Sequence, residues 1–436
     1  MTFLRTLVLI LIWALPARAD MIIQSVTSKG GITAWLVQDS GIPFTALEIQ
    51  FRGGTSLDAP GKRGAVNLMT ALIEEGAGDL DAQAFAAARD ALAASFSFQP
   101  QGDSVSVSAK FLTEFRDPAI DLLHLALTEP RFDADAVQRV RGQVLAGLRA
   151  DAKDPGTLAS DTFKQLAFGD HPYGSSGDGT IESVAALTRD DVVDAHKGAL
   201  ARDRIYVAAA GDISPEELGT LLDRLFEGLP ATGAPLPDRV EWTLSQGVTT
   251  VDFPTPQSTV IFGHGGLKRD DPDFFAAFIL NEVLGGGRFS ARLMTEVREK
   301  RGLTYGIGTG LAPMDHAEMW LGQFSSDNGK VAEAIKVVQD EWQKVATEGI
   351  TETELEDAKT YMTGSYPLRF DSNESIASIL VGMQMENLPI DYAVTRNAKV
   401  EAVTLDDVKR VAAGLMKPDA LHFVVVGQPE GLTPTP

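Results

Sequence analysis

Apolar and polar residues alternate in several short stretches of the first half of the chain, which is typical of strands with one buried face. These stretches are 21–28, 33–37, 43–51, 94–100 and 104–111. Apolar residues at helical spacing lie between and after them and predict helices. The predicted helices are 65–75, 81–92, 115–128, 133–151, 181–186, 188–199 and 214–227, and a strand is predicted at 205–211.

The same order of elements returns after residues 228–238, which carry three prolines and two glycines and so indicate a linker. Strands are predicted at 258–264, 317–324 and 421–427, and helices at 271–284, 327–347, 351–363, 372–388 and 404–416. The strands that begin at 104 and 317 correspond, which gives an offset of about 213 residues. We interpret this as an internal duplication, with two unrelated domains as the alternative.

The predicted fold class is therefore α+β, with two tandem homologous domains. Each domain is expected to hold a mostly antiparallel sheet with helices packed on one face. The expected boundaries are 1–19 for a signal peptide, 20–227 and 248–428 for the two domains, 228–247 for the linker and 429–436 for a tail. A chain of 436 residues is too long for one ordinary core, in agreement with this division.

The N-terminus has the pattern of a secretory signal. Arg5 precedes an apolar run, 7–15, and Ala17-Arg18-Ala19 fits the rule for signal cleavage. We expect cleavage after Ala19, a secreted, periplasmic protein and no stable membrane insertion afterwards; an uncleaved anchor helix is the alternative. No other segment approaches the ~18 consecutive apolar residues of a membrane span.

Composition excludes several kinds of chemistry. The net charge of −22 argues against nucleic-acid binding, which needs clustered Lys and Arg. The chain has no cysteine, so disulfides, thiolate metal sites and cysteine nucleophiles are excluded. Among its six histidines no two lie within five positions, so neither H-E-x-x-H nor H-x-x-E-H occurs. A metal site assembled from distant histidines stays open, whereas a serine-hydrolase G-x-S-x-G elbow is absent.

Residues 285–306 combine unusual features in one stretch. Gly285, Gly286 and Gly287 lack the Gly-Lys-Ser/Thr that would complete a phosphate-binding loop, and they lead into an amphipathic run. We predict a helix that ends at Gly302 and a strand that starts near Tyr305, with Arg298 on the last helical turn. Arginine and tyrosine at such a corner could both donate hydrogen bonds to one ligand oxygen. A surface arginine and a strand tyrosine are the alternative.

Three segments carry a resemblance to a known family. They are 54–76, 168–192 and 285–306, and the last is the most specific. The chain resembles the pitrilysin-like zinc peptidases, or inverzincins, in their short two-domain form. This form includes the mitochondrial processing peptidase subunits, the core subunits of the respiratory bc1 complex and bacterial processing-type proteases. The resemblance covers nearly the whole mature chain.

The resemblance implies a zinc motif shortly after residue 64, and the residues expected there are missing. Asn67 and Ala71 stand where the two zinc-binding histidines belong, and Thr70 stands where the water-activating glutamate belongs. Ala146 and Gly147 occupy the positions of glutamates on a later helix, where the third ligand belongs. Because a catalytic zinc ion needs about three protein ligands, we expect no metal ion or other cofactor in this chain and no peptidase activity from the chain alone.

The resemblance also implies a role for the residues that remain. In two-chain members one chain brings the zinc helix and the other brings the Arg/Tyr pair, here Arg298 and Tyr305. The expected partner is a similar chain that carries H-x-x-E-H and zinc, and the expected substrates are peptides, with Gly285–Gly287 as a substrate loop. The alternatives are a scaffold or peptide-binding protein without peptidase activity, an inactive homodimer and a peptidase with an unorthodox metal site.

Overall fold

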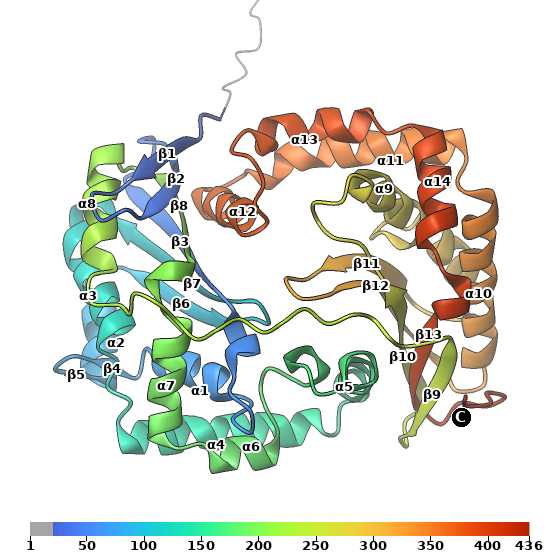
Figure 1. Ribbon diagram of the computed structural model, residues 1–436, viewed down its shortest axis with the longest axis horizontal. Helices are drawn as coiled ribbons and strands as arrows, with labels where there is room; N and C mark the ends of the chain where they lie inside the picture. Colours follow the sequence, from blue (N-terminus) through green and yellow to red (C-terminus); the bar gives the residue numbers. More distant parts are fainter. Residues whose placement is uncertain (1–20, 436) are drawn as a thin grey trace, which may run out of the picture.

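The computed structural model describes residues 21–435, so the expected signal peptide, 1–19, lies outside the described residues. The chain forms two halves that lie side by side, each with its own sheet and helices (Figure 1). Residues 226–246 connect the last helix of the first half to the first strand of the second and contain neither helix nor strand. None of the helices in residues 21–435 combines the length and apolar character needed to cross a membrane.

The first half contains a six-stranded sheet with the order β1-β2-β8-β3-β7-β6. Its strands are β1 (Gln24–Thr27), β2 (Thr33–Gln38), β3 (Phe44–Arg52), β6 (Ser95–Pro100), β7 (Ser104–Leu112) and β8 (Ile205–Gly211). Only the β2–β8 pair is parallel. A small separate ribbon joins β4 (Gly76–Ala77) to β5 (Leu80–Asp81).

The second half contains a five-stranded sheet with the order β11-β12-β10-β13-β9. Its strands are β9 (Gly247–Asp252), β10 (Gln257–Gly265), β11 (Ile307–Pro313), β12 (Glu318–Asp327) and β13 (His422–Gly427). Only the β13–β9 pair is parallel. Without β1, the first sheet has the order β2-β8-β3-β7-β6, which matches β9-β13-β10-β12-β11 strand for strand. The predicted fold class, two related α+β domains with mostly antiparallel sheets, is confirmed.

Helices of the same half gather on one face of each sheet, some in contact with the strands and the others packed on those helices. In the first half these are α1 (Ala65–Leu72), α2 (Ala82–Ala91), α3 (Arg116–Thr128), α4 (Ala134–Asp151), α6 (Ile181–Ala186), α7 (Arg189–Ala199) and α8 (Pro215–Leu225). In the second half they are α9 (Phe274–Gly285), α10 (Val331–Glu348), α11 (Glu352–Ser365), α13 (Tyr392–Glu401) and α14 (Leu405–Leu415). Alternate strand residues enter each core, as Leu47, Ile49 and Phe51 of β3 do.

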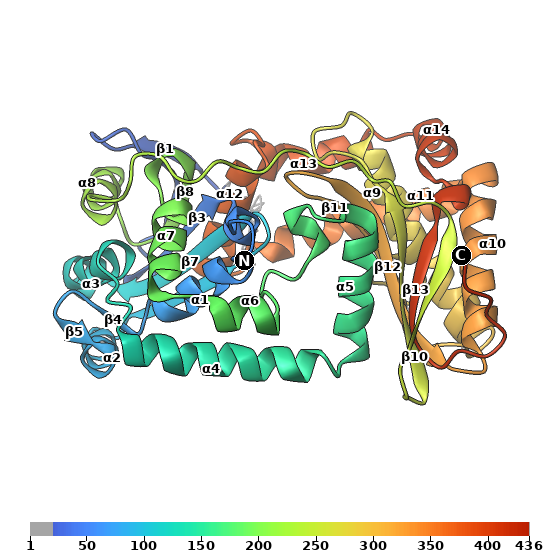
Figure 2. The same ribbon diagram turned by 60° about the horizontal axis from the view of Figure 1, so that its bottom comes forward.

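The opposite, inner face of each sheet is covered by a helix that comes from the other half. Helix α5 (Pro155–Phe168) packs its Ala159 and Phe163 against Val424 and Val426 of β13. Figure 2 shows α5 standing against the second sheet. Helix α12 (Asn373–Met385) packs in the same way on β3 and β8 of the first sheet. Because burying these apolar faces is favourable, the exchange fastens the halves together.

The sequence analysis did not predict helices α5 and α13, strand β9 or the ribbon of β4 and β5, and it misplaced one boundary. Strand β9 is largely polar, α13 lacks a strong apolar stripe, and α5 begins with the turn-forming pair Pro155-Gly156. A strand was predicted to start near Tyr305, but β11 begins at Ile307. The Thr304 hydroxyl causes this difference: it accepts a hydrogen bond from the Gly306 N–H (3.2 Å) and donates to Ser325 O (2.7 Å). These bonds hold a bend ahead of the strand.

Candidate functional site

The stretch 285–306 folds as a turn and a helix, as its pattern predicts, and then as a bend where the pattern predicts the start of a strand. Its helical core is a π-helix, Met294–Glu299, and the fully buried Leu293 and Val297 fix its inner face. The helix ends at Gly302, which adopts a left-handed conformation (φ +60°) and donates its N–H to Arg298 O at 2.8 Å. This end places Arg298 on the last turn, where the sequence predicts it.

Gly285 lets the end of α9 lie directly against strand β11. A Cβ atom at residue 285 would lie 2.3 Å from Thr309 Oγ1, so only glycine fits there. Thr309 donates to Asn281 Oδ1 (2.8 Å), which also accepts from Trp320 Nε1 (2.9 Å). These contacts fix the position of the glycine turn relative to the sheet.

A cleft of about 910 Å³ opens beside this turn, and we call it the β11 cleft. It is lined by Gly285 and Gly287, residues 304–310, residues 319 and 321–325 of β12, residues 257, 259 and 261 of β10, and residues 160, 163 and 164 of α5. Its floor is the inner face of the second sheet, and α5 forms one wall. Tyr305, 86% exposed, is one of its lining residues.

The Arg298 side chain lies at the same corner of the fold but is not among the residues that line the cleft. Its guanidinium carbon lies 4.7 Å from the centre of the exposed Phe289 ring, a cation–π contact. Glu296, on the same helix, pairs with Lys300 and Arg301 instead, at 2.6 and 2.8 Å. Within residues 21–435 no carboxylate forms a salt bridge with Arg298, so its charge is available to a ligand.

The first half brings together the two helices on which the resemblance places a zinc site. Helices α1 and α4 pack against each other. Asn67 is half-buried and Ala71 is exposed on α1, while Ala146 and Gly147 are exposed on α4. Thr70 is buried, and its hydroxyl donates to Val66 O at 2.8 Å. These positions offer an amide and a hydroxyl that is already hydrogen-bonded, but no imidazole or carboxylate. They therefore do not fit a catalytic zinc ion.

One group of potential metal ligands was missed by the sequence reasoning. In the part of the chain that the structure describes, only Asp103, Asp315 and His316 bring three ligand atoms within 4.8 Å of one another. Asp103 lies in the turn between β6 and β7, and Asp315 and His316 lie in the turn between β11 and β12. The internal duplication could have indicated this group, because residues 103 and 316 differ by the offset of 213 that relates the two halves.

Comparisons with known proteins agree with this architecture. Residues 186–362 match a family model described as "Peptidase M16 inactive domain". The chain is 27% identical over 390 residues to "Non-peptidase homolog YmxG" of Helicobacter pylori, covering 88% of this chain and 89% of the relative. It is 28% identical over 407 residues to an uncharacterized zinc protease of Streptomyces coelicolor, covering 90% and 87%.

Two solved structures show the same fold. A crystal structure of a peptidase M16 inactive domain from Pseudomonas fluorescens superposes with a TM-score of 0.88 at 29% identity, covering 95% of this chain and 100% of that one. A protease from Helicobacter pylori superposes with a TM-score of 0.84 at 18% identity, covering 93% and 99%. The likeness therefore extends over both halves and includes their relative placement.

Proposed function

We propose that the chain, which is similar to non-catalytic members of the peptidase M16 family, is one subunit of a heterodimeric periplasmic zinc endopeptidase. In this proposal a similar chain carrying H-x-x-E-H supplies the zinc ion and the activated water. This chain supplies Arg298 and Tyr305 in trans. The signal pattern before Asp20 supports the periplasmic location.

The observation that carries the proposal is the contrast between the two halves. The positions of the zinc ligands on α1 and α4 hold no metal-binding side chain, whereas Tyr305 extends its phenol into solvent beside a large cleft. A tyrosine hydroxyl can donate a hydrogen bond to a carbonyl oxygen as negative charge develops on it. An arginine without a carboxylate partner can hold a second carbonyl oxygen of the same peptide.

The β11 cleft supports peptides as the ligands. Strand β11 is an edge of its sheet, so one side of its backbone can pair with an extended peptide. Gly308 and Gly310 line the cleft without side chains, and a Cβ atom at Gly310 would meet no atom within 4 Å. Phe163, Ile261 and Leu321 add apolar lining surface. We therefore propose that one side chain of an extended peptide enters this space.

The test uses this chain purified together with a similar chain that carries H-x-x-E-H and is encoded by a neighbouring reading frame. Tyr305→Phe removes the proposed donor, so we expect kcat for peptide cleavage to fall on the order of 10²-fold while the complex still forms. Tyr361→Phe is the matched control, since this exposed tyrosine lies on α11 and its ring contacts Arg288 at 4.9 Å. Unchanged cleavage by the Tyr305→Phe complex would refute the role of the phenol.

A scaffold or peptide-binding protein of the same fold is the second candidate. The relative named "Non-peptidase homolog" favours it, as does the lack of metal-binding side chains on α1 and α4. This candidate predicts a stable assembly, or peptide binding, with no peptide cleavage under any metal supply. The decisive result would be a peptide that binds the wild-type chain but not Gly310→Leu, and that is not cleaved when the partner is present. This result would favour the peptide-binding protein over the heterodimeric peptidase.

A further inference from the structure

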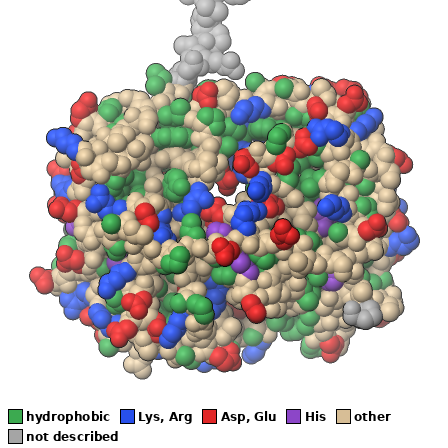
Figure 3. Space-filling model, in the orientation of Figure 1, with side chains coloured by type: hydrophobic (Ala, Val, Ile, Leu, Met, Phe, Trp, Pro, Cys, Tyr) green, Lys and Arg blue, Asp and Glu red, His purple; other side chains and the backbone are tan. Residues whose placement is uncertain are grey.

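The tips of two hairpins meet in the middle of the molecule. The β6–β7 hairpin points toward the β11–β12 hairpin (Figure 1), and these two hairpins correspond to each other in the duplicated strand order. The backbone N–H of Asp315 donates to Asp103 Oδ2 at 3.1 Å, so the tips are in direct contact. Lys and Arg, Asp and Glu, and His side chains gather around a hollow in the middle of this face (Figure 3).

The two carboxylates at the tips are held by neighbours and keep free acceptor capacity. Asp103 Oδ1 accepts a hydrogen bond from the Tyr173 hydroxyl, and Asp315 Oδ2 accepts one from Arg52 Nη1 at 2.7 Å. The side chain of Asp315 keeps its second oxygen for another partner, and each carboxylate oxygen has two lone pairs. Both acids are therefore pre-oriented, and one guanidinium balances only part of their charge.

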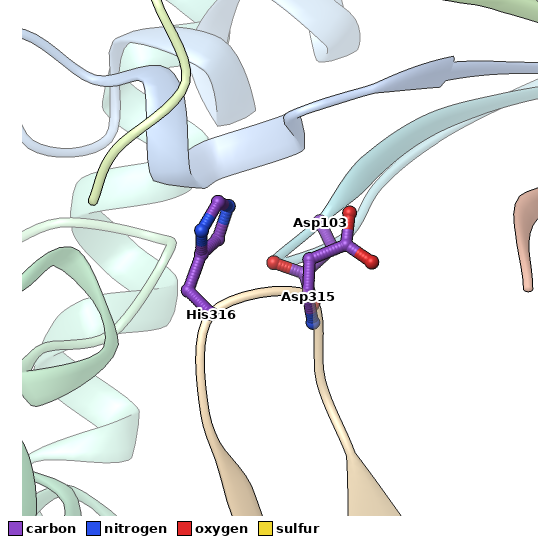
Figure 4. A group of neighbouring side chains, drawn as sticks. All are labelled: Asp103, Asp315 and His316. Atoms are coloured by element: carbon purple, nitrogen blue, oxygen red, sulfur yellow. The ribbon is translucent and has the colours of Figure 1, made fainter. Parts of the chain in front are cut away.

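His316 is the feature that these hydrogen bonds do not explain. Its residue is only 7% exposed, and its Nε2 atom is buried without a hydrogen-bond partner. Leaving such an atom unpaired is unfavourable, and most buried polar atoms in proteins are satisfied. Figure 4 shows the His316 ring beside the Asp103 and Asp315 carboxylates, and one ligand atom of each lies within 4.8 Å of the others.

An imidazole binds a metal ion through a nitrogen lone pair, and the unpaired Nε2 atom of His316 can offer one. A bound cation of charge +2 would satisfy this lone pair and complete the neutralisation of the two carboxylates.

We propose that Asp103, Asp315 and His316 bind a divalent transition-metal ion that fastens the two hairpin tips to each other. Two carboxylate oxygens and one imidazole nitrogen suit Zn²⁺ and its first-row neighbours, and a water molecule completes the coordination. Ligand atoms around Zn²⁺ lie roughly 3.5 Å apart, so binding draws the tips slightly together. The role is structural, is independent of the proposed peptidase complex, and departs from the expectation from sequence that this chain holds no metal.

The experiment measures metal binding by the mature chain after it has been stripped with a chelator. Equilibrium dialysis against Zn²⁺ should give one bound ion per chain, and bound Co²⁺ should give the visible absorption of a site with a nitrogen ligand. His316→Gln should weaken binding by at least about tenfold. Zn²⁺ should raise the unfolding temperature of the wild-type chain by a few degrees and leave that of His316→Gln unchanged.

Matched variants separate this site from adventitious surface binding. His171→Gln removes a neighbouring imidazole, 6.2 Å from the His316 ring centre, whose Nε2 already contacts Asp238 O at 3.0 Å. It should keep the stoichiometry and the affinity of the wild type. Asp103→Asn is the second ligand variant, for use if circular dichroism shows that His316→Gln is unfolded. No binding to the wild type, or equal binding to the folded ligand variants, would overturn the proposal.

Discussion

Replacing Glu48 by Gln tests the packing of α12, a helix of the second half, on the sheet of the first half. Glu48 lies on β3 at the inner face of the sheet, in a layer where α12 packs on the apolar Ala46 and Ala208. Ser108 Oγ donates to Glu48 Oε2 at 2.7 Å. Burial raises the pKa of Glu48 from 4.5 to about 7, the Ser108 bond opposes the shift, and the charge of Glu374 adds to it.

The raised pKa gives the stability a defined pH dependence. The unfolded chain loses this proton near pH 4.5, whereas the folded chain keeps it to about pH 7. The folded state therefore binds more protons between these values, and its stability falls as the pH rises through this window. One pKa unit corresponds to about 1.4 kcal/mol, which sets an upper limit of about 3 kcal/mol. Because Glu48 is only half-buried, we expect roughly 2 kcal/mol.

Glutamine keeps the shape of the side chain and can still accept the hydrogen bond from Ser108, but it carries no charge. Glu48→Gln should match the wild type at pH 4 and be more stable by roughly 2 kcal/mol at pH 8. Urea unfolding followed by tryptophan fluorescence at several pH values measures this difference. Glu333→Gln, on the exposed side of α10, controls for removal of one negative charge. A difference that stays constant between pH 4 and 8, or that reverses sign, would refute the reasoning.

Three further predictions test the packing between the two halves and the core of the second half. Leu380→Ala on α12 removes a fully buried side chain at the first sheet. It should lower the free energy of unfolding by about 2–4 kcal/mol in urea titrations, and a loss below about 1 kcal/mol would contradict the packing of α12. Cleavage at a protease site inserted in residues 232–246 should leave both halves in one size-exclusion peak, because α5 and α12 remain exchanged; separated halves would disprove this. Trp342→Phe removes the donor to His264 Nε2 (3.1 Å) and should cost about 1–3 kcal/mol. Burial lowers the pKa of His264 to about 4, so neutral His264 stabilises the fold fully above pH 6.5. This stabilisation is lost as the pH falls toward 4, and urea titrations at pH 4.5 and 7 would detect the loss.

Local patterns in the sequence were enough to find most elements and the relation between the halves. Alternation predicted β3 and β7, and helical spacing predicted α1 and α10 close to their observed bounds. These patterns are visible because each element must bury one face, whatever it packs against. The missing imidazoles and carboxylates on α1 and α4 were also decided by the sequence, since a metal site requires particular residue types. The positions of Arg298 and the glycine turn followed from helix-ending rules.

Contacts between distant parts of the chain were decided only by the tertiary structure. The apolar run Phe423–Val426 of β13 indicates a strand buried on both faces, but not that α5, more than 250 residues earlier, covers one of them. An apolar helix face is equally compatible with either sheet, so periodicity alone could not reveal the exchange of α5 and α12. The same holds for Asp103, Asp315 and His316, which are unremarkable turn residues until the two hairpins meet. The sequence thus determined the parts and the missing zinc ligands, while long-range packing decided which surfaces and side chains come together.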